Sequence, residues 1–171
     1  KAKNIRLSGV TGEEGFGRLL VNVSDLSLGY VDPLFEKVSF QIREGEVLEI
    51  RGRNGAGKTT MVKTLLATVA NATLPAQVFA GHIDVDKKIR VGVYEQEIRG
   101  ELLDKTLADA IEHIYLSRGL TIGDTKIRQL MSDYLFTAGD ANIPVMQLSG
   151  GQKARLQLIS MLSEGPSLLI L

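Results

Sequence analysis

The residues from Gly52 to Thr60 have the types and the spacing of a phosphate-binding loop. They read Gly-Arg-Asn-Gly-Ala-Gly-Lys-Thr-Thr, which fits the pattern G-x-x-x-x-G-K-[ST]. Glycines let main-chain N–H groups turn inward and approach a polyphosphate closely. In such a loop Lys58 reaches the terminal phosphates and the Thr59 hydroxyl coordinates Mg²⁺. The predicted binding residues for a polyphosphate with Mg²⁺ are Gly52, Arg53, Asn54, Gly55, Ala56, Gly57, Lys58, Thr59 and Thr60.

The segments beside this loop favour a phosphate site over a plain glycine-rich turn. Val47 to Ile50 is a short apolar run before the loop, typical of a buried strand. After the loop, apolar residues recur at helical spacing from Met61 to Val69. A helix that begins near Gly57 would present its positive dipole end and unpaired N–H groups to the phosphates.

The rest of the pattern mixes strands with amphipathic helices. Alternation predicts strands over 19–24, continuing to Leu28 after a slip at Asp25, and over 38–42, 77–83 and 90–94, with a buried parallel strand at 168–171. Residues 139–144 are expected to form a loop. Three helices are expected, with apolar faces formed by Leu107, Ile111 and Ile114 behind a Thr106 cap; by Ile127, Leu130, Met131, Tyr134 and Leu135; and by Leu156, Ile159 and Leu162.

Composition limits the classes of function. The 171 residues suit one domain, and a formal net charge of zero gives no global field for a nucleic acid or a membrane. The absence of cysteine excludes disulfides and cysteine–metal sites. Because no apolar run approaches membrane-spanning length, we expect a cytoplasmic chain without direct membrane insertion. The sequence starts without Met and stops within an apolar run, so we expect a fragment of a longer protein.

One segment gives the chain a family resemblance. Leu148-Ser149-Gly150-Gly151-Gln152, downstream of the phosphate loop, resembles the signature motif of ATP-binding cassette (ABC) ATPases. Tyr30 resembles the aromatic of the family's A-loop, and Glu95-Gln96 resembles its Q-loop. The run 163–166 before the last apolar segment resembles the approach to Walker B. The resemblance covers nearly the whole chain from Leu19 onward.

The resemblance implies a role for each motif. Tyr30 would stack on adenine, and Gln96 would ligate Mg²⁺ and position the attacking water. Ser149, Gly150, Gly151 and Gln152 would contact the γ-phosphate bound to a second cassette, so that this motif acts in trans. Lys58, Gln96 and Ser149 would then be the catalytic residues.

Plainer interpretations stand beside these roles. Tyr30 could be a core or turn aromatic, Gln96 a solvated loop residue, and Ser149 an ordinary helix cap. His82 and His113 both precede the signature motif, whereas the switch histidine of the family follows Walker B. Neither histidine is given a role.

The resemblance also implies a fold. We expect an α/β fold in which a P-loop NTPase core with a mixed sheet is joined to an antiparallel β subdomain and to a helical subdomain at about 102–140. Residues 1–17 would be a linker tail and 18–171 the cassette. The Walker B Asp and the catalytic Glu would follow Leu171, so the 171-residue chain alone should hydrolyse ATP negligibly.

Three functional hypotheses follow. Residues 28–30 and 34–35, the short segment at about 91–96 and residues 151–156 resemble the ABC-F subfamily, whose two-cassette proteins often act on the ribosome. The linker-like start suggests the second cassette. The alternatives are the ATPase subunit of a membrane transporter, with a transmembrane partner docking after Gln96, and a non-hydrolysing nucleotide-binding module.

Overall fold

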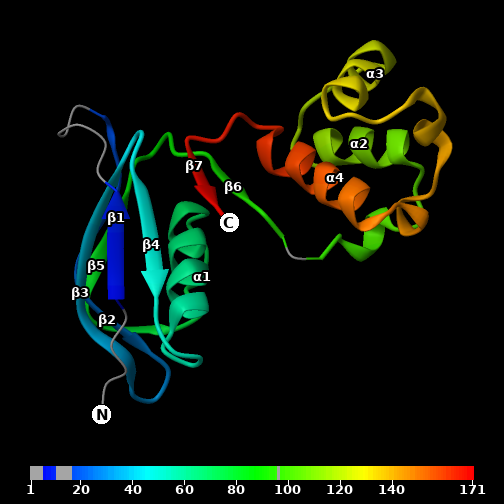
Figure 1. Ribbon diagram of the computed structural model, residues 1–171. Coiled ribbons are helices and arrows are strands. Elements are labelled where there is room, and N and C mark those ends of the chain that lie inside the picture. The colour runs from blue at the N-terminus through cyan, green and yellow to red at the C-terminus, as the bar shows by residue number, and fades with distance from the viewer. Residues whose placement is uncertain (1–5, 11–16, 96) are drawn as a thin grey trace. The chain divides into compact units, whose positions relative to one another are not determined.

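The chain divides into two units. The structure, a computed structural model, describes residues 6–10, 17–95 and 97–171 (Figure 1). The first unit comprises residues 1–89 and the second residues 90–171. The boundary predicted at residue 18 and the helical subdomain predicted at about 102–140 stay predictions.

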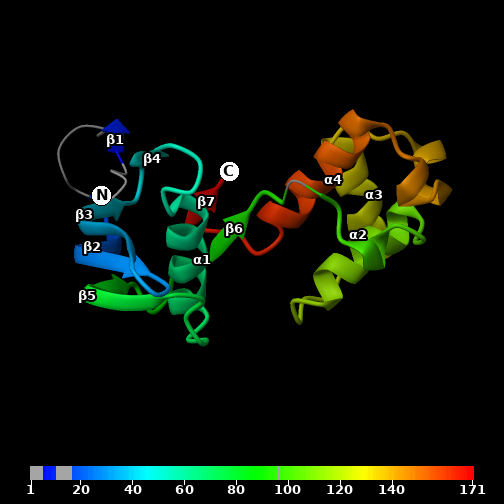
Figure 2. The ribbon, with the colours of Figure 1, turned by 90° about the horizontal axis from the view of Figure 1, so that it is seen from below.

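Antiparallel strands form most of the first unit. Strands β2 (Leu19–Gly29), β3 (Pro33–Arg43) and β5 (Gln77–Val85) make a sheet in the order β3-β2-β5, as Figure 2 shows. Helix α1 (Lys58–Val69) packs beside β5. The core of the unit is centred on β2, whose apolar side chains are almost fully buried: Leu20, Val21, Val23, Leu26 and Leu28.

The slip predicted at Asp25 is confirmed as an irregularity in β2. Asp25 has a φ of 46°, and the register of β2 against β3 shifts between Val23 and Leu26. Gly81 of β5 lies against this point, where a Cβ would come within 2.3 Å of the Ser24 carbonyl oxygen. The extra residue therefore reorients the strand, so that Leu26 and Leu28 return to the buried face.

The strand before the phosphate loop differs from expectation. Strand β4 (Val47–Arg51) pairs antiparallel with β1 (Arg6–Val10), a strand inside the segment predicted as a tail. The prediction of a buried β4 is wrong for the described residues, because its side chains are exposed or half-buried and Val47 is 65% exposed. A sheet of two strands, as β1 and β4 form here, cannot cover both of its own faces.

The second unit combines a short parallel sheet with helices. Strands β6 (Val91–Val93) and β7 (Leu168–Ile170) pair in parallel, which confirms the predicted direction of the last strand. Leu169 of β7 is nevertheless 45% exposed, so the expected cover on both faces is not seen among the described residues. Parallel and antiparallel pairs thus occupy separate sheets here, within the expected α/β P-loop fold.

The helices of the second unit enclose one core. They are α2 (Leu107–Leu116), α3 (Asp124–Asp133) and α4 (Gly150–Leu162). The short 3₁₀ helix η1 (Gly100–Leu102) precedes α2, and η2 (Ala138–Asn142) and η3 (Val145–Gln147) lie between α3 and α4. The prediction of a loop at 139–144 is wrong in part, because residues 138–142 form η2, whose N-terminal end is held by hydrogen bonds from Thr137 to the Asp140 carboxylate. The buried core is formed by Leu102, Leu107, Ala110, Ile111, Ile114, Ile127, Met131, Phe136, Val145, Leu148, Leu156 and Ile159.

Two residues of the predicted apolar faces are exposed, whereas Leu130 and Tyr134 are partly buried against this core. Leu135 is 77% exposed because α3 ends before it and its φ is 60°, which turns the side chain off the helix face. Leu162, the last residue of α4, is also exposed.

The Thr106 cap is confirmed, since its hydroxyl accepts a hydrogen bond from the Asp109 N–H at 3.2 Å. No helix in the described residues is long and apolar enough to cross a bilayer.

Candidate nucleotide-binding site

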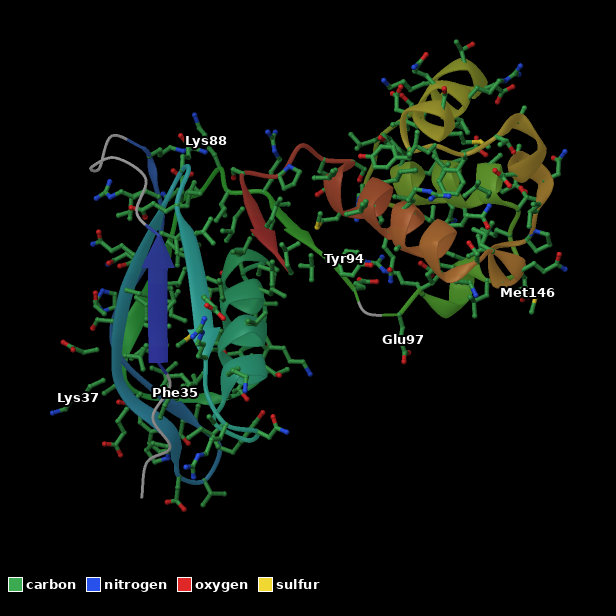
Figure 3. All side chains as sticks on the ribbon, in the orientation of Figure 1. Phe35, Lys37, Lys88, Tyr94, Glu97 and Met146 are labelled. Atoms are coloured by element: carbon green, nitrogen blue, oxygen red, sulfur yellow. The ribbon has the colours of Figure 1, made fainter. Side chains whose placement is uncertain are left out.

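The phosphate-type loop joins β4 to α1 and requires glycine at two points. Gly55 and Gly57 have φ values of 75° and 97°, in the left-handed region that glycine favours. At Gly57 a Cβ would also stand 2.9 Å from the Phe35 ring and 3.2 Å from Leu34 Cβ. Figure 3 shows Phe35 in the first unit, where its side chain is buried. The tight turn into α1 therefore depends on both the conformation and the small size of Gly57.

Lys58 closes this loop from the start of α1. Its Nζ donates hydrogen bonds to the carbonyl oxygens of Gly52, at 2.7 Å, and Arg53, at 3.1 Å. An ammonium group has three protons, and these two bonds use two of them. The positive charge is thus held at the loop by the main chain, with one proton left to donate to an anion.

The first turn of α1 offers N–H groups for an anion. Its N-cap is Gly57, and no side chain caps it, in contrast to α2 and α4. Thr59 in this turn is exposed, whereas Thr60 is buried. A helix start without a side-chain cap, an exposed hydroxyl and a nearby ammonium fit a polyphosphate with Mg²⁺.

Tyr30 lies near the same turn. It occupies the bend between β2 and β3, and its hydroxyl is 3.5 Å from Thr60 Oγ1. The side chain is 57% exposed, so Tyr30 is not a core aromatic. The first unit therefore brings together Tyr30 and the loop from Gly52 to Thr60, as the sequence predicts.

The signature segment forms the start of α4 in the second unit. Ser149 is the N-cap: its Oγ accepts from the Gln152 N–H at 3.2 Å, and Gln152 Oε1 accepts from the Ser149 N–H at 2.9 Å. Because Ser149 Oγ accepts in this bond, its own proton stays available to an anion. Gly150 and Gly151 beside it are exposed. The position of Ser149 at the N-terminus of α4 thus fits both interpretations, an ordinary helix cap and an anion-binding site.

Asp140 supports this helix start, and the sequence analysis missed it. Asp140 Oδ1 accepts from Gln152 Nε2 at 3.0 Å, and Oδ2 accepts from the Thr137 N–H and hydroxyl at 2.7 and 2.9 Å. The main-chain and side-chain hydrogen bonds from Thr137, with the bond from Gln152, lower the pKa of Asp140 below its ordinary value of 3.8. The spacing Thr-x-x-Asp is a capping-box signal that could have identified it.

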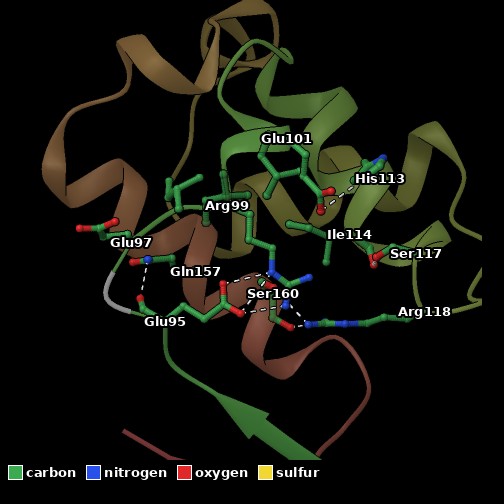
Figure 4. Close-up of a pocket in the computed structure, with 13 residues that line it drawn as sticks. Glu95, Glu97, Arg99, Glu101, His113, Ile114, Ser117, Arg118, Gln157 and Ser160 are labelled. Carbon is green, nitrogen blue, oxygen red and sulfur yellow. Dashed lines mark hydrogen bonds and ion pairs between the residues drawn. The ribbon is translucent and has the colours of Figure 1, made fainter.

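The structure describes only one of the two residues predicted for the Q-loop. Gln96 lies outside the described residues, but its neighbour Glu95 is fixed in two ways, as Figure 4 shows. The Glu95 carboxylate accepts three hydrogen bonds from the Arg99 guanidinium at 2.8–3.2 Å, and its carbonyl oxygen accepts from Gln157 Nε2 at 2.5 Å. Hydrogen bonding to Glu95 raises the pKa of Arg99. No short-range sequence signal pointed to Gln157.

The histidines form exposed pairs with carboxylates. His82 Nε2 is 3.1 Å from Asp84, and His113 Nε2 is 3.6 Å from Glu101. Among the described residues, no group of three or more His, Cys, Asp or Glu side chains could hold a metal. The structure thus adds nothing that would give either histidine a role.

Comparison with known proteins identifies the family of the chain. Residues 35–171 match the family model described as ABC transporter. The chain is 34% identical over 157 residues to the ATP-binding protein YdiF of Bacillus subtilis, covering 91% of this chain and 23% of YdiF. It is 30% identical over 155 residues to the zinc import ATP-binding protein ZnuC of Marinobacter nauticus, covering 89% of this chain and 54% of ZnuC. The chain thus spans only part of the length of these curated relatives.

Solved structures share the fold. An ABC transporter ATP-binding protein from Pyrococcus furiosus aligns with a TM-score of 0.57 at 22% identity, covering 82% of this chain and 68% of that one. A metal-chelate type ABC transporter in an inward-facing conformation aligns with a TM-score of 0.63 at 20% identity, covering 88% and 58%.

Proposed function

Because the chain belongs to the ABC transporter family, we propose that it binds ATP with Mg²⁺ and, in the complete protein, takes part in ATP hydrolysis. The observation that carries the proposal is the Lys58 ammonium, held by the Gly52 and Arg53 carbonyl oxygens at a helix start that no side chain caps. The family match extends over this loop and the signature segment. We therefore assign the N-terminal ends of α1 and α4 to the same nucleotide-dependent function.

Each residue has a distinct task in this proposal. Main-chain N–H groups of the loop from Gly52 to Thr60 bind the phosphates, and Lys58 donates to their terminal oxygens. Tyr30 stacks on the adenine. Thr59 and Gln96 hold Mg²⁺, which neutralises charge that develops during phosphoryl transfer.

The signature segment serves a second cassette. Ser149 keeps its hydroxyl proton while it caps α4, and the exposed Gly150 and Gly151 let main-chain N–H groups approach a phosphate. We propose that Ser149 to Gln152 contact the γ-phosphate bound to the loop of a partner cassette, in the same protein or in a second copy. ATP binding would then draw two cassettes together.

For the role of the complete protein we propose an ABC-F ATPase that acts on the ribosome. The support is the resemblance of residues 28–30, 34–35, about 91–96 and 151–156 to that subfamily. The similarity to ZnuC favours a second candidate, the ATPase subunit of a transporter whose membrane partner docks on the cassette. A non-hydrolysing module is the third.

Two measurements on the complete protein test these proposals. Equilibrium binding of ATP tests the nucleotide site, and its absence would contradict the whole proposal. Co-sedimentation with ribosomes in the presence of ATP, using a hydrolysis-dead variant, separates the roles. ATP-dependent sedimentation supports the ABC-F role, whereas its absence together with binding to a membrane partner supports the transporter role.

A further inference from the structure

Gln157 joins the signature helix to the segment that leaves β6. Its Nε2 donates to the Glu95 carbonyl oxygen at 2.5 Å, two turns after the helix start at Ser149. We propose that Gln157 is a positioning residue that fixes the direction of α4 and thereby the place of Ser149 during ATP turnover. The inference rests on the proposed function, because its effect is on that reaction.

Besides the Gln157–Glu95 hydrogen bond, α4 has a second contact with β6, and both are needed to fix the direction of the helix. Gly92 of β6 lies directly on the last turn of α4, where a Cβ would come within 2.5 Å of the Met161 carbonyl oxygen. As a contact between β6 and α4, this approach meets the helix at one point and would by itself let α4 pivot against the strand. The bond from Gln157 to Glu95 is one helical turn away from Met161 on α4 and three residues further along the other chain segment. Two contacts at separate points together fix the direction of α4 relative to β6.

The length of α4 makes the position of Ser149 sensitive to the direction of the helix. Ser149 precedes Met161 by twelve residues, or about 18 Å along the helix axis at a rise of about 1.5 Å per residue. A pivot of about 10° at Met161 would therefore move Ser149 by roughly 3 Å. Displacements of about 1 Å can cost about a hundredfold in rate when a reaction depends on position. Loss of the second contact should thus affect turnover more than binding.

The acceptor end of this bond is itself held. The Arg99 guanidinium grips the Glu95 carboxylate, and the Leu102 N–H donates to the Arg99 carbonyl oxygen at 2.9 Å. Leu102 is buried in the helical core. These residues and Gln157 line a small pocket, seen in Figure 4. Glu95 follows β6 by two residues, so its bonds with Gln157 and Arg99 tie the segment that leaves β6 to the helical core that contains α4.

The decisive variant is Gln157→Glu, which keeps the size of the side chain and removes the donor. We expect kcat for ATP, per nucleotide-binding site, to fall about tenfold or more in the complete protein while ATP affinity stays within about twofold. Gln157→Lys restores a donor and should recover most of kcat. The matched control is Gln129→Glu on α3, where the glutamine Nε2 donates to Asp133 at 2.7 Å; it should leave kcat unchanged.

The outcomes separate the positioning role from the proposed function. Wild-type kcat in Gln157→Glu would overturn the positioning role, and so would a Gln157→Lys variant as slow as Gln157→Glu, because the donor would then be irrelevant. Both results leave ATP binding intact. Failure of the unaltered complete protein to bind ATP would instead overturn the proposed function.

Discussion

At the scale of single residues, the site depends on side chains that the fold holds in place without using all of their hydrogen-bonding groups or contact surface. Lys58 uses two of its three protons on the loop, and Ser149 accepts a hydrogen bond without spending its own proton. Tyr30 lies at a strand end with much of its ring exposed. Each residue is thus held in place by the protein and still has capacity for a ligand.

The exposed ring of Tyr30 leads to a prediction about adenine. Tyr30→Ala should weaken ATP binding by about 1–3 kcal/mol, the usual cost of removing an aromatic that stacks on a base. Tyr30→Phe keeps the ring and loses only the hydroxyl near Thr60, so it should bind almost as well as the wild type. Fluorescence titration with ATP compares the variants. Equal losses in both would assign the effect to the hydroxyl and not to stacking.

Most of the residues proposed for the site could be named from the sequence, because their motifs are local. The loop from Gly52 to Thr60 and the segment from Ser149 to Gln152 each fall within nine or fewer consecutive positions. Gln157 and Glu95 are 62 residues apart, and only the folded chain brings them together. Such long-range contacts carry no short-range pattern and therefore escaped prediction.

At the scale of elements, two helices offer a matched test of capping against catalysis. Thr106 caps α2 and Ser149 caps α4 through the same bond to an N–H three residues on. Alanine at either position should cost about 1 kcal/mol of unfolding free energy. Only Ser149→Ala should also lower ATP turnover, by about tenfold or more, because only this hydroxyl faces a phosphate in the proposal.

Denaturant unfolding and steady-state hydrolysis measure the two effects separately. If Thr106→Ala lowers turnover as much as Ser149→Ala does, loss of helix stability explains both results and Ser149 has no special task. If Ser149→Ala leaves turnover unchanged, the signature helix is an ordinary capped helix.

The hydrogen bonds of Asp140 predict a dependence of stability on pH. Since its folded pKa lies below the ordinary 3.8, the ionised carboxylate stabilises the fold. This contribution is fully present above about pH 4 and disappears as pH falls through the lower folded pKa. In Asp140→Asn the decline in unfolding free energy below pH 4 should be shallower than in the wild type. Parallel acid-unfolding curves for the two proteins would contradict this role.

Prediction of the elements was good where residues alternate or recur regularly and poorer at ends and edges. The apolar stripe of α2 is buried as predicted. Leu135 was misplaced because a helical face was extended past the last turn of α3. The burial of β4 was misjudged because apolar content alone does not reveal which strands will lie beside it.

At the scale of the whole molecule, the sequence predicts the fold class because the order of motifs along the chain is that of a cassette. The family match over residues 35–171 and the shared fold of solved structures agree with it. The division at Ile89 and Arg90 was not foreseen, since sheet membership depends on pairings between distant strands. The chain spans 23% of the length of YdiF.

The central claim is that the Lys58 ammonium and the surrounding main chain bind the phosphates of ATP. The most direct measurement is ATP affinity of Lys58→Ala in the complete protein, beside Lys63→Ala, a change at an exposed lysine on the same helix. Loss of a charge-assisted hydrogen bond should weaken binding about ten- to a hundredfold in Lys58→Ala, with Lys63→Ala unchanged. ATP affinity and turnover equal to those of the wild type in Lys58→Ala would contradict the account.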